Sequence, residues 1–286
     1  MSKTAIIIDS LACIPKEVVE RYKIGIVPVI IFFEGKSYRD WIDLTPAQGY
    51  EFLERAPQFW KSSAASPEDY LKVYQELSIY ADNILVITVS VKLSMFYNSA
   101  QVAKGIAKEK LPKLNIEVLD SETVTAAEGF VALAAAKAAS EGKPFDEIIA
   151  IAKKVKEKVT FLALLDTMRY VHRTGRIPKI VAQIGSTLSI KPILTVSKGV
   201  VHFMTAARTR LSGIDRMLNT MRSQVGNSEP VHVAVMHADA LEDAEALKQR
   251  VSAEFNCVEL FITDFSPIMG YATGRGTLAL AYYKAL

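Results

Sequence analysis

The chain has 286 residues, half of them hydrophobic, with 34 basic and 31 acidic side chains and a formal net charge of +3 at pH 7. This near balance excludes a general nucleic-acid binder, and no uninterrupted apolar stretch approaches the roughly 20 residues that a membrane span needs. Two cysteines, Cys13 and Cys257, stand in no metal or redox spacing, and no signal-peptide pattern is present, so we expect a soluble cytoplasmic protein of two domains.

The first half of the chain alternates apolar runs with helical segments. Predicted strands span residues 4–8, 25–33, 84–89 and 116–119. Predicted helices span residues 15–22, 45–55, 94–110 and 123–141, and Ser66-Pro67-Glu68-Asp69 is the start signal of another over residues 70–80. Continuous β-branched runs are typical of strands buried on both faces, and strands that alternate with helices favour a parallel, doubly wound sheet. Pro28 indicates an edge strand or a kink in the second run, and residues 61–66 form a predicted polar loop.

Three of these strands run into hydroxyl-bearing residues. They are followed or ended by Asp9-Ser10, Ser90 and Asp120-Ser121. Because ligands of such sheets bind in the crevice beyond the carboxyl ends of the strands, we expect a polar head group to be held there. The two aspartates also suggest an acid–base pair or a metal site, but helix capping is the favoured interpretation. No nucleophile elbow or phosphate-binding loop accompanies them, which favours binding over catalysis.

The second half follows a different pattern. A helix over 145–158 precedes predicted strands at 161–165, 232–236, 258–263 and 277–282, a hairpin of 191–196 with 200–203, and helices at 213–225 and 241–255. The sequence therefore predicts an α/β fold of two domains divided near residue 158. Residues 1–158 form a parallel sheet flanked by helices, and residues 159–286 form an α/β domain with a mixed, largely antiparallel sheet. The apolar excess leaves room for a ligand cavity, although a well-packed core explains it more simply.

Six phrases in a fixed order carry a resemblance to a known family. They are IIIDS (6–10), SSAASPEDY (62–70), LSMFYNSA (93–100), VLDSETV (118–124), RTGRIPK (173–179) and IKPILTVSKG (190–199). Through this ordered set the chain resembles the DegV family over nearly its whole length, including the fatty-acid-binding subunits of bacterial fatty acid kinases. The resemblance implies a two-domain protein without a cofactor that buries one long-chain fatty acid in its N-terminal domain. It also implies that the C-terminal domain covers the carboxylate at the domain interface, and that a separate kinase subunit phosphorylates it.

The resemblance also implies which residues hold the carboxylate. Ser94 stands where the family has a carboxylate-binding serine, and it opens a predicted helix whose N–H groups favour an anion. Ser62 keeps the hydroxyl of a family threonine that contacts the head group, while Ser63 supports the loop and Lys61 is more simply a solvated lysine. Arg208 stands where the family has an arginine that reaches the head group from the second domain, and a surface arginine is the alternative.

The sequence departs from the family pattern in two places. Met95 and Phe96 replace a Gly-Thr pair, and Ala272 stands where the family has a histidine that helps to hold the carboxylate. Alanine cannot donate a hydrogen bond. We hypothesise that Lys61 or Arg275 supplies the missing donor, or that the pocket holds a different head group.

Five basic residues lie within one short segment, Arg169–Lys179. They are Arg169, His172, Arg173, Arg176 and Lys179. The resemblance implies that this segment docks a fatty acid kinase subunit, and a solvated surface is the alternative. Nucleic acid is a poorer interpretation, because no stacking aromatic accompanies the charge beyond Tyr170. Arg176 could instead pair with a carboxylate such as Asp166.

The sequence as a whole predicts a lipid-binding protein that is not an enzyme and has no catalytic residue, metal or cofactor. Ser62, Ser94 and Arg208 meet the carboxylate, and apolar side chains line the tail. The first alternative is an enzyme, an acyl hydrolase or transferase that uses the same crevice. The second alternative is a protein-interaction module whose cavity is vestigial. The histidines show no ligand spacing, His237 at a strand end being the strongest candidate. The sequence also allows transient contact of the protein with a membrane surface.

Overall fold

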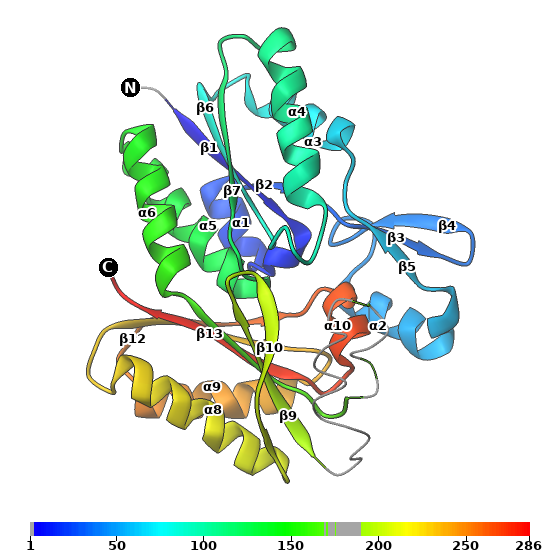
Figure 1. Cartoon of the computed structure of the whole chain (residues 1–286), viewed down its shortest axis with the longest axis vertical. Coiled ribbons are helices and arrows are strands. Elements are labelled where there is room, and N and C mark those ends of the chain that lie inside the picture. The colour runs from blue at the N-terminus through cyan, green and yellow to red at the C-terminus, as the bar shows by residue number, and fades with distance from the viewer. Residues whose placement is uncertain (1–2, 169, 171–174, 176–189) are drawn as a thin grey trace. The chain divides into compact units, whose positions relative to one another are not determined.

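The protein folds into two compact units, and its computed structural model describes residues 3–168, 170, 175 and 190–286. The first unit is Met1–Leu44 with Phe59–Glu157, and the second is Thr45–Gln58 with Lys158–Leu286. An early segment of about one helix therefore packs with the second half of the chain. Figure 1 gives the element labels used below.

A four-stranded parallel sheet forms the core of the first unit, with the strand order β2-β1-β6-β7. Its strands are β1 (Thr4–Asp9), β2 (Gly25–Val27), β6 (Asn83–Thr88) and β7 (Asn115–Asp120). Every residue of β6 is buried, as expected for a central β-branched strand that is covered on both faces. The predicted parallel sheet is confirmed, and β2 is the edge strand that Pro28 indicated.

Helices cover both faces of this sheet (Figure 1). They are η1 (Ser10–Ala12), α1 (Lys16–Tyr22), α3 (Pro67–Leu77), α4 (Phe96–Lys110), α5 (Thr125–Ser140) and α6 (Phe145–Lys158). Helix α3 packs on α4, and α5 packs on α1 and along β1. Ser66 begins α3 with a capping box, in which its hydroxyl accepts from the Asp69 N–H and the Asp69 carboxylate accepts from the Ser66 N–H. None of the described helices has the length and apolarity needed to span a membrane.

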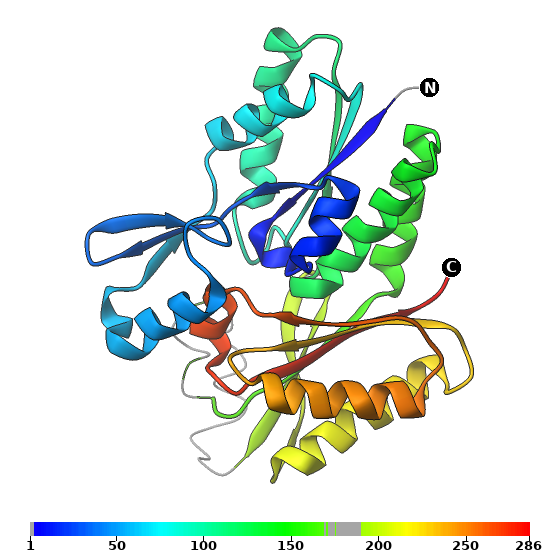
Figure 2. The same ribbon diagram turned by 180° about the vertical axis from the view of Figure 1, so that it is seen from behind.

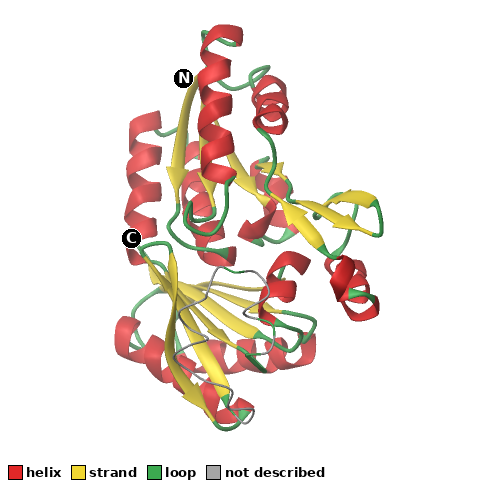
Figure 3. Ribbon diagram, turned by 45° about the vertical axis from the view of Figure 1, so that its right-hand side comes forward, coloured by secondary structure: helices red, strands yellow, loops and turns green. Residues whose placement is uncertain are grey.

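A second, three-stranded sheet with the order β4-β3-β5 belongs to the same unit (Figure 3). It consists of β3 (Ile30–Phe33), β4 (Lys36–Arg39) and β5 (Lys61–Ser63). The prediction of one strand over 25–33 was wrong, because the chain leaves the parallel sheet at Pro28, which has no N–H to donate to a ladder. The predicted loop over 61–66 was also wrong in part, since its first three residues pair with β3.

A six-stranded sheet with the order β10-β9-β8-β13-β11-β12 forms the second unit. Its strands are β8 (Thr160–Leu164), β9 (Lys191–Ser197), β10 (Val200–Ala207), β11 (Val231–His237), β12 (Cys257–Asp264) and β13 (Leu278–Lys284). Neighbouring strands are antiparallel except for the parallel pair β11–β12, which confirms the predicted mixed sheet and the β9–β10 hairpin. Figure 2 shows α8 (Arg210–Val225) and α9 (Leu241–Glu254) along one face of this sheet.

Helix α2 (Pro46–Arg55) belongs to the second unit and packs on α10 (Pro267–Thr273), and the first unit resumes at the last residue of the short turn η2 (Pro57–Phe59). The Tyr50 ring lies against the backbone of Gly270, where an added Cβ would be 2.1 Å from Tyr50 Cε1. The Tyr50 hydroxyl also donates to the Phe265 carbonyl at 3.4 Å. Glycine at position 270 is therefore a packing requirement. The sequence did not predict α10, whose seven residues include this glycine.

Candidate ligand-binding site

The carboxyl ends of β1, β6 and β7 lie along one edge of the parallel sheet in the first unit, because these strands are in parallel register. Asp9, the last residue of β1, is fully buried, and its two carboxylate oxygens accept from Leu11 N–H at 3.0 Å and from Val89 N–H at 2.8 Å. The first of these bonds caps η1, as the sequence predicted for Asp9. The second fixes the segment that follows β6. Asp9 is thus an anchor between two strand ends.

The other polar groups at this edge also hold the backbone. Asp120 Oδ1 accepts from Glu122 N–H at 2.9 Å and from Val91 N–H at 3.3 Å. Ser121 Oγ accepts from Thr123 N–H at 3.2 Å. The bonds from Glu122 and Thr123 form turns before α5, whose N-cap residue is Val124 without a side-chain cap, and the bond from Val91 joins the segments that follow β6 and β7. The prediction that Asp120 and Ser121 cap that helix was therefore wrong.

Ser94 lies in the loop between β6 and α4 and is half-buried. The helix begins two residues later than predicted, at Phe96, with Met95 as N-cap. Ser94 N–H donates to the Ser90 carbonyl at 3.1 Å, and Ser90 N–H donates to the Thr123 carbonyl at 3.0 Å. The loop that carries Ser94 is therefore tied to the ends of β6 and β7, while the Ser94 hydroxyl bonds to no other described residue.

Three predicted residues, Lys61, Ser62 and Ser63, form the edge strand β5, and all three are exposed. Ser62 pairs with Ile31 of β3, whereas Lys61 and Ser63 pair with the residues on either side of it. Paired residues of antiparallel strands share a face, and successive residues alternate between faces. Ser62 therefore lies on the face of the buried Ile31, and the other two lie on the opposite face.

Two neighbouring arginines of the second unit differ in their contacts. Arg208, between β10 and α8, is exposed and makes no hydrogen bond or ion pair with another described residue. Arg210 Nη1 donates to the Gly276 carbonyl at 2.7 Å, and Arg210 Nη2 lies 2.7 Å from Asp243 Oδ2. Arg208 is thus available to an anion, while Arg210 holds elements of its own unit together.

Arg275 lies directly after α10 and is paired with two carboxylates. Its Nη1 lies 2.6 Å from Glu54 Oε2, and its Nη2 pairs with Asp239. The guanidinium joins α2 to the loop that follows β11. Ala272 lies within α10 and is half-buried. The structure therefore gives Arg275 a role in packing α2, and no hydrogen bond joins any two of the predicted site residues.

His237, the strongest histidine candidate, ends β11 and is buried in the second unit. Its Nδ1 accepts from Ala240 N–H at 3.3 Å and lies 3.6 Å from Asp264 Oδ1. Burial lowers the pKa of His237, against the opposing charge of Asp264. Among the described residues, no group of three or more His, Cys, Asp or Glu side chains is arranged to hold a metal ion. The basic residues Arg169, His172, Arg173, Arg176 and Lys179 lie outside the described part of the chain.

Sequence reasoning missed a buried carboxyl group beside Asp9. Glu128 of α5 is fully buried and lies within hydrogen-bonding reach of the Asp9 carboxyl. Burial raises the pKa of Glu128 well above its ordinary value, and the Asp9 charge raises it further. Burial likewise raises the pKa of Asp9 to about 7, although its two backbone donors oppose this. The sign of this buried group in the sequence is a single acidic residue among the apolar and small residues of α5.

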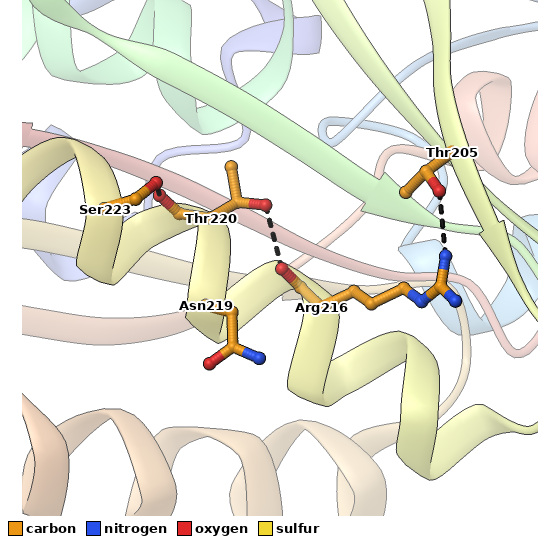
Figure 4. Close-up of a pocket in the computed structure, with 5 residues that line it drawn as sticks. All are labelled: Thr205, Arg216, Asn219, Thr220 and Ser223. Atoms are coloured by element: carbon orange, nitrogen blue, oxygen red, sulfur yellow. Dashed lines mark hydrogen bonds between the residues drawn. The ribbon is translucent and has the colours of Figure 1, made fainter.

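A polar pocket of about 360 Å³ lies between β10 and α8 in the second unit (Figure 4). Its lining residues are Thr205, Arg216, Asn219, Thr220 and Ser223. Arg216 Nη1 donates to Thr205 Oγ1 at 2.9 Å and to the Ala206 carbonyl at 2.6 Å. Ligand pockets for apolar molecules are lined mainly by hydrophobic side chains, so this pocket does not suit an acyl chain.

Comparisons with known proteins agree over the whole chain. A family described as "Uncharacterised protein, DegV family" matches residues 3–285. A DegV domain-containing protein of Clostridium perfringens is 29% identical over 279 residues, which are 98% of each chain. A solved structure of a DegV family protein from Thermus thermophilus, described by its fatty acid binding, has a TM-score of 0.90 at 26% identity and covers 99% of this chain and 100% of its own. The solved structure of DegV from Bacillus subtilis, described as a fatty acid binding protein, has a TM-score of 0.90 at 27% identity over 100% of both chains.

Proposed function

This chain belongs to the DegV family, and from this premise we propose that it binds one long-chain fatty acid. The observation that carries the proposal is the full-length likeness to two DegV proteins of Thermus thermophilus and Bacillus subtilis that are described as fatty acid binding. The composition supports it, since half of the residues are hydrophobic. Burial of an acyl chain contributes about 0.8 kcal/mol per methylene group, so the tail dominates the affinity.

A carboxylate that leaves water requires charge and hydrogen bonds to compensate its desolvation. We propose that Ser62, Ser94 and Arg208 supply them. What supports this choice is that the side chains of Ser94 and Arg208 bond to no other described residue, and that Ser62 is exposed on β5. Hydroxyl groups donate to the carboxylate oxygens, and a guanidinium adds charge-assisted bonds.

Arg275 and Lys61 are the two residues that could replace the hydrogen-bond donor missing at Ala272, and their contacts make both unfavourable for this role. Arg275 has its guanidinium between Glu54 and Asp239, so binding a ligand there costs it existing ion pairs. Lys61 lies on the face of β5 opposite to Ser62. We therefore propose that the head group is held by Ser62, Ser94 and Arg208 without a replacement for the family histidine, and that Ser63 supports β5.

We further propose that the protein is a non-catalytic carrier that offers the bound carboxylate to a fatty acid kinase subunit. That subunit would transfer the γ-phosphoryl group of ATP to a carboxylate oxygen and release ADP. The support is the family resemblance and the charge of Arg169–Lys179. A test is acyl phosphate formation by a purified kinase subunit, which should require this protein and weaken when Arg173→Glu and Arg176→Glu are combined.

Titration of lipid-free protein with a long-chain fatty acid tests the binding proposal. Calorimetry should show one site per chain, and the methyl ester of the same acid should bind at least about tenfold more weakly, because it lacks the charge that Arg208 recognises. A short-chain acid is the control for the tail. Equal binding of acid and ester would contradict the proposed carboxylate site.

The same preparation separates a carrier from an acyl hydrolase or transferase. Incubation with an activated acyl ester should release product no faster than buffer, and the protein mass should stay unchanged apart from a non-covalent ligand. Multiple turnovers, or one acyl group covalently bound per chain, would contradict the carrier and support the enzyme.

A further inference from the structure

Glu128 has an environment that does not suit an ionised carboxylate. Its side chain lies inside the first unit with no exposed surface, and neither carboxyl oxygen accepts a hydrogen bond from any described N–H or O–H group. A buried carboxylate without donors is among the costliest groups in a protein interior. A neutral Glu128 avoids this cost if its proton has an acceptor nearby.

Asp9 provides that acceptor. Each of its oxygens already accepts one backbone N–H, from Leu11 and from Val89, and such bonds favour the charged form of a carboxyl group. Glu128 has no comparable donors and lies within hydrogen-bonding reach of Asp9. Of the two groups, Asp9 is therefore the anion and Glu128 the proton carrier.

The groups around the pair reinforce this assignment. Asp40 acts on Asp9, and Asp120 acts on Glu128, both as negative charges that oppose a second ionisation. From α3, Tyr70 faces both carboxyl groups, and its own pKa is raised well above the ordinary value by burial and then by Asp9. A pair of close carboxyl groups in such surroundings keeps one proton up to a pH well above 4.

We propose that protonated Glu128 is a positioning residue for the loop that carries Ser94. Its O–H donates to the Asp9 carboxylate, and Asp9 Oδ2 in turn holds Val89 N–H at 2.8 Å. The next residue, Ser90, is bonded to Thr123 and accepts from Ser94 N–H at 3.1 Å. The proton on Glu128 thus links α5 to the backbone beside Ser94. The effect on ligand affinity rests on the proposed function, whereas the effect on stability does not.

The direction of the pH dependence follows from the raised pKa values of both carboxyl groups. In the unfolded chain the two groups titrate near their ordinary values of about 4, whereas in the folded chain the pair keeps a proton to higher pH. Between about pH 4 and the pH at which the folded pair releases its proton, the folded state binds more protons than the unfolded state. The free energy of unfolding therefore falls as the pH rises through this range. Burial raises the pKa values of both carboxyl groups, so the coupled pair in the folded protein releases its shared proton well above pH 4.

Two substitutions at position 128 and one control test the proposal. Glu128→Gln keeps an N–H donor toward Asp9 but cannot ionise, and Glu128→Leu keeps the approximate volume but has no donor. Glu141→Gln changes an exposed glutamate beyond the end of the same helix. Thermal unfolding is recorded from pH 5 to pH 9 without fatty acid, and fatty acid affinity is measured at pH 6 and pH 8.

The wild type and Glu141→Gln should lose several degrees of melting temperature more than Glu128→Gln between pH 5 and pH 9. Glu128→Gln should also keep its fatty acid affinity at pH 8, while Glu128→Leu binds more weakly at both pH values. Parallel melting curves for the wild type and Glu128→Gln, or equal affinities for the Gln and Leu variants, would overturn the positioning role. Absence of fatty acid binding at every pH would instead contradict the proposed function and leave the melting curves to decide the role of Glu128.

Discussion

Most polar side chains at the carboxyl edge of the first sheet are bonded to the backbone around them. Asp9, Asp120 and Ser121 each accept backbone N–H groups at the strand ends. Strands that end in Ser and Asp therefore predicted that polar side chains gather at the carboxyl edge of the sheet. The pattern could not show which of these side chains are already bonded to the backbone and which could still bind a ligand. Ser94 and Arg208 differ from this group only through three-dimensional contacts that no local pattern encodes.

Arg208→Ala should weaken fatty acid binding by about 10- to 100-fold, because a charge-assisted hydrogen bond contributes about 1.5–3 kcal/mol. The measurement is calorimetric titration of the lipid-free protein. Arg216→Ala is the matched control, since Arg216 lies in the same unit but lines the separate polar pocket. Equal losses in the two variants would show that net charge, rather than a contact of Arg208, determines the affinity.

Ser62→Ala and Ser63→Ala form a second matched pair. The two serines are adjacent and exposed, but they lie on opposite faces of β5. Loss of the Ser62 hydroxyl should weaken fatty acid binding by about tenfold, because one bond to a charged group is removed. Ser63→Ala should bind within about twofold of the wild type. The reverse order of effects would place the ligand on the other face of the strand.

At the scale of helices and strands, local signals predicted most of the fold. Helices with strong start signals, such as α3 after Ser66-Pro67, were placed within a few residues of their observed bounds. The errors occur where tertiary contacts determine the structure. Pro28 moves the chain from one sheet to another, and β5 exists only because β3 offers it an edge. Helix α10 is too short for periodicity to reveal.

Gly270→Ala tests the packing of α2 on α10. The added methyl group would overlap the Tyr50 ring, so the variant should lose about 1–3 kcal/mol of stability in chemical denaturation. Gly105→Ala in α4 is the control, because nothing lies within 4 Å of its added methyl group and helix propensity should raise stability by up to about 1 kcal/mol. Tyr50→Ala should relieve part of the loss in Gly270→Ala. Unchanged stability of Gly270→Ala would contradict the described contact between the two helices.

At the scale of the whole molecule, the chain is organised by contacts between distant segments. Tyr50 in α2 bonds to Phe265, 215 residues later, and Arg275 pairs with Glu54 over a similar separation. The local pattern of residues 45–55 predicts a helix but does not show with which sheet it packs. The buried pair of Asp9 and Glu128 was missed for the same reason, since its members are neighbours only after β1 and α5 have packed together.

The proposed carrier function requires that this protein holds one non-covalently bound fatty acid. Native mass spectrometry of the protein, purified without added lipid or detergent, tests it most directly. We predict one chain with a mass excess equal to a single long-chain fatty acid, which is released as the free acid when the protein unfolds. The excess should be reduced in a variant that combines Ser62→Ala, Ser94→Ala and Arg208→Ala. A ligand-free wild-type protein that also fails to take up fatty acid, or an excess mass that remains covalently attached after unfolding, would contradict the carrier function.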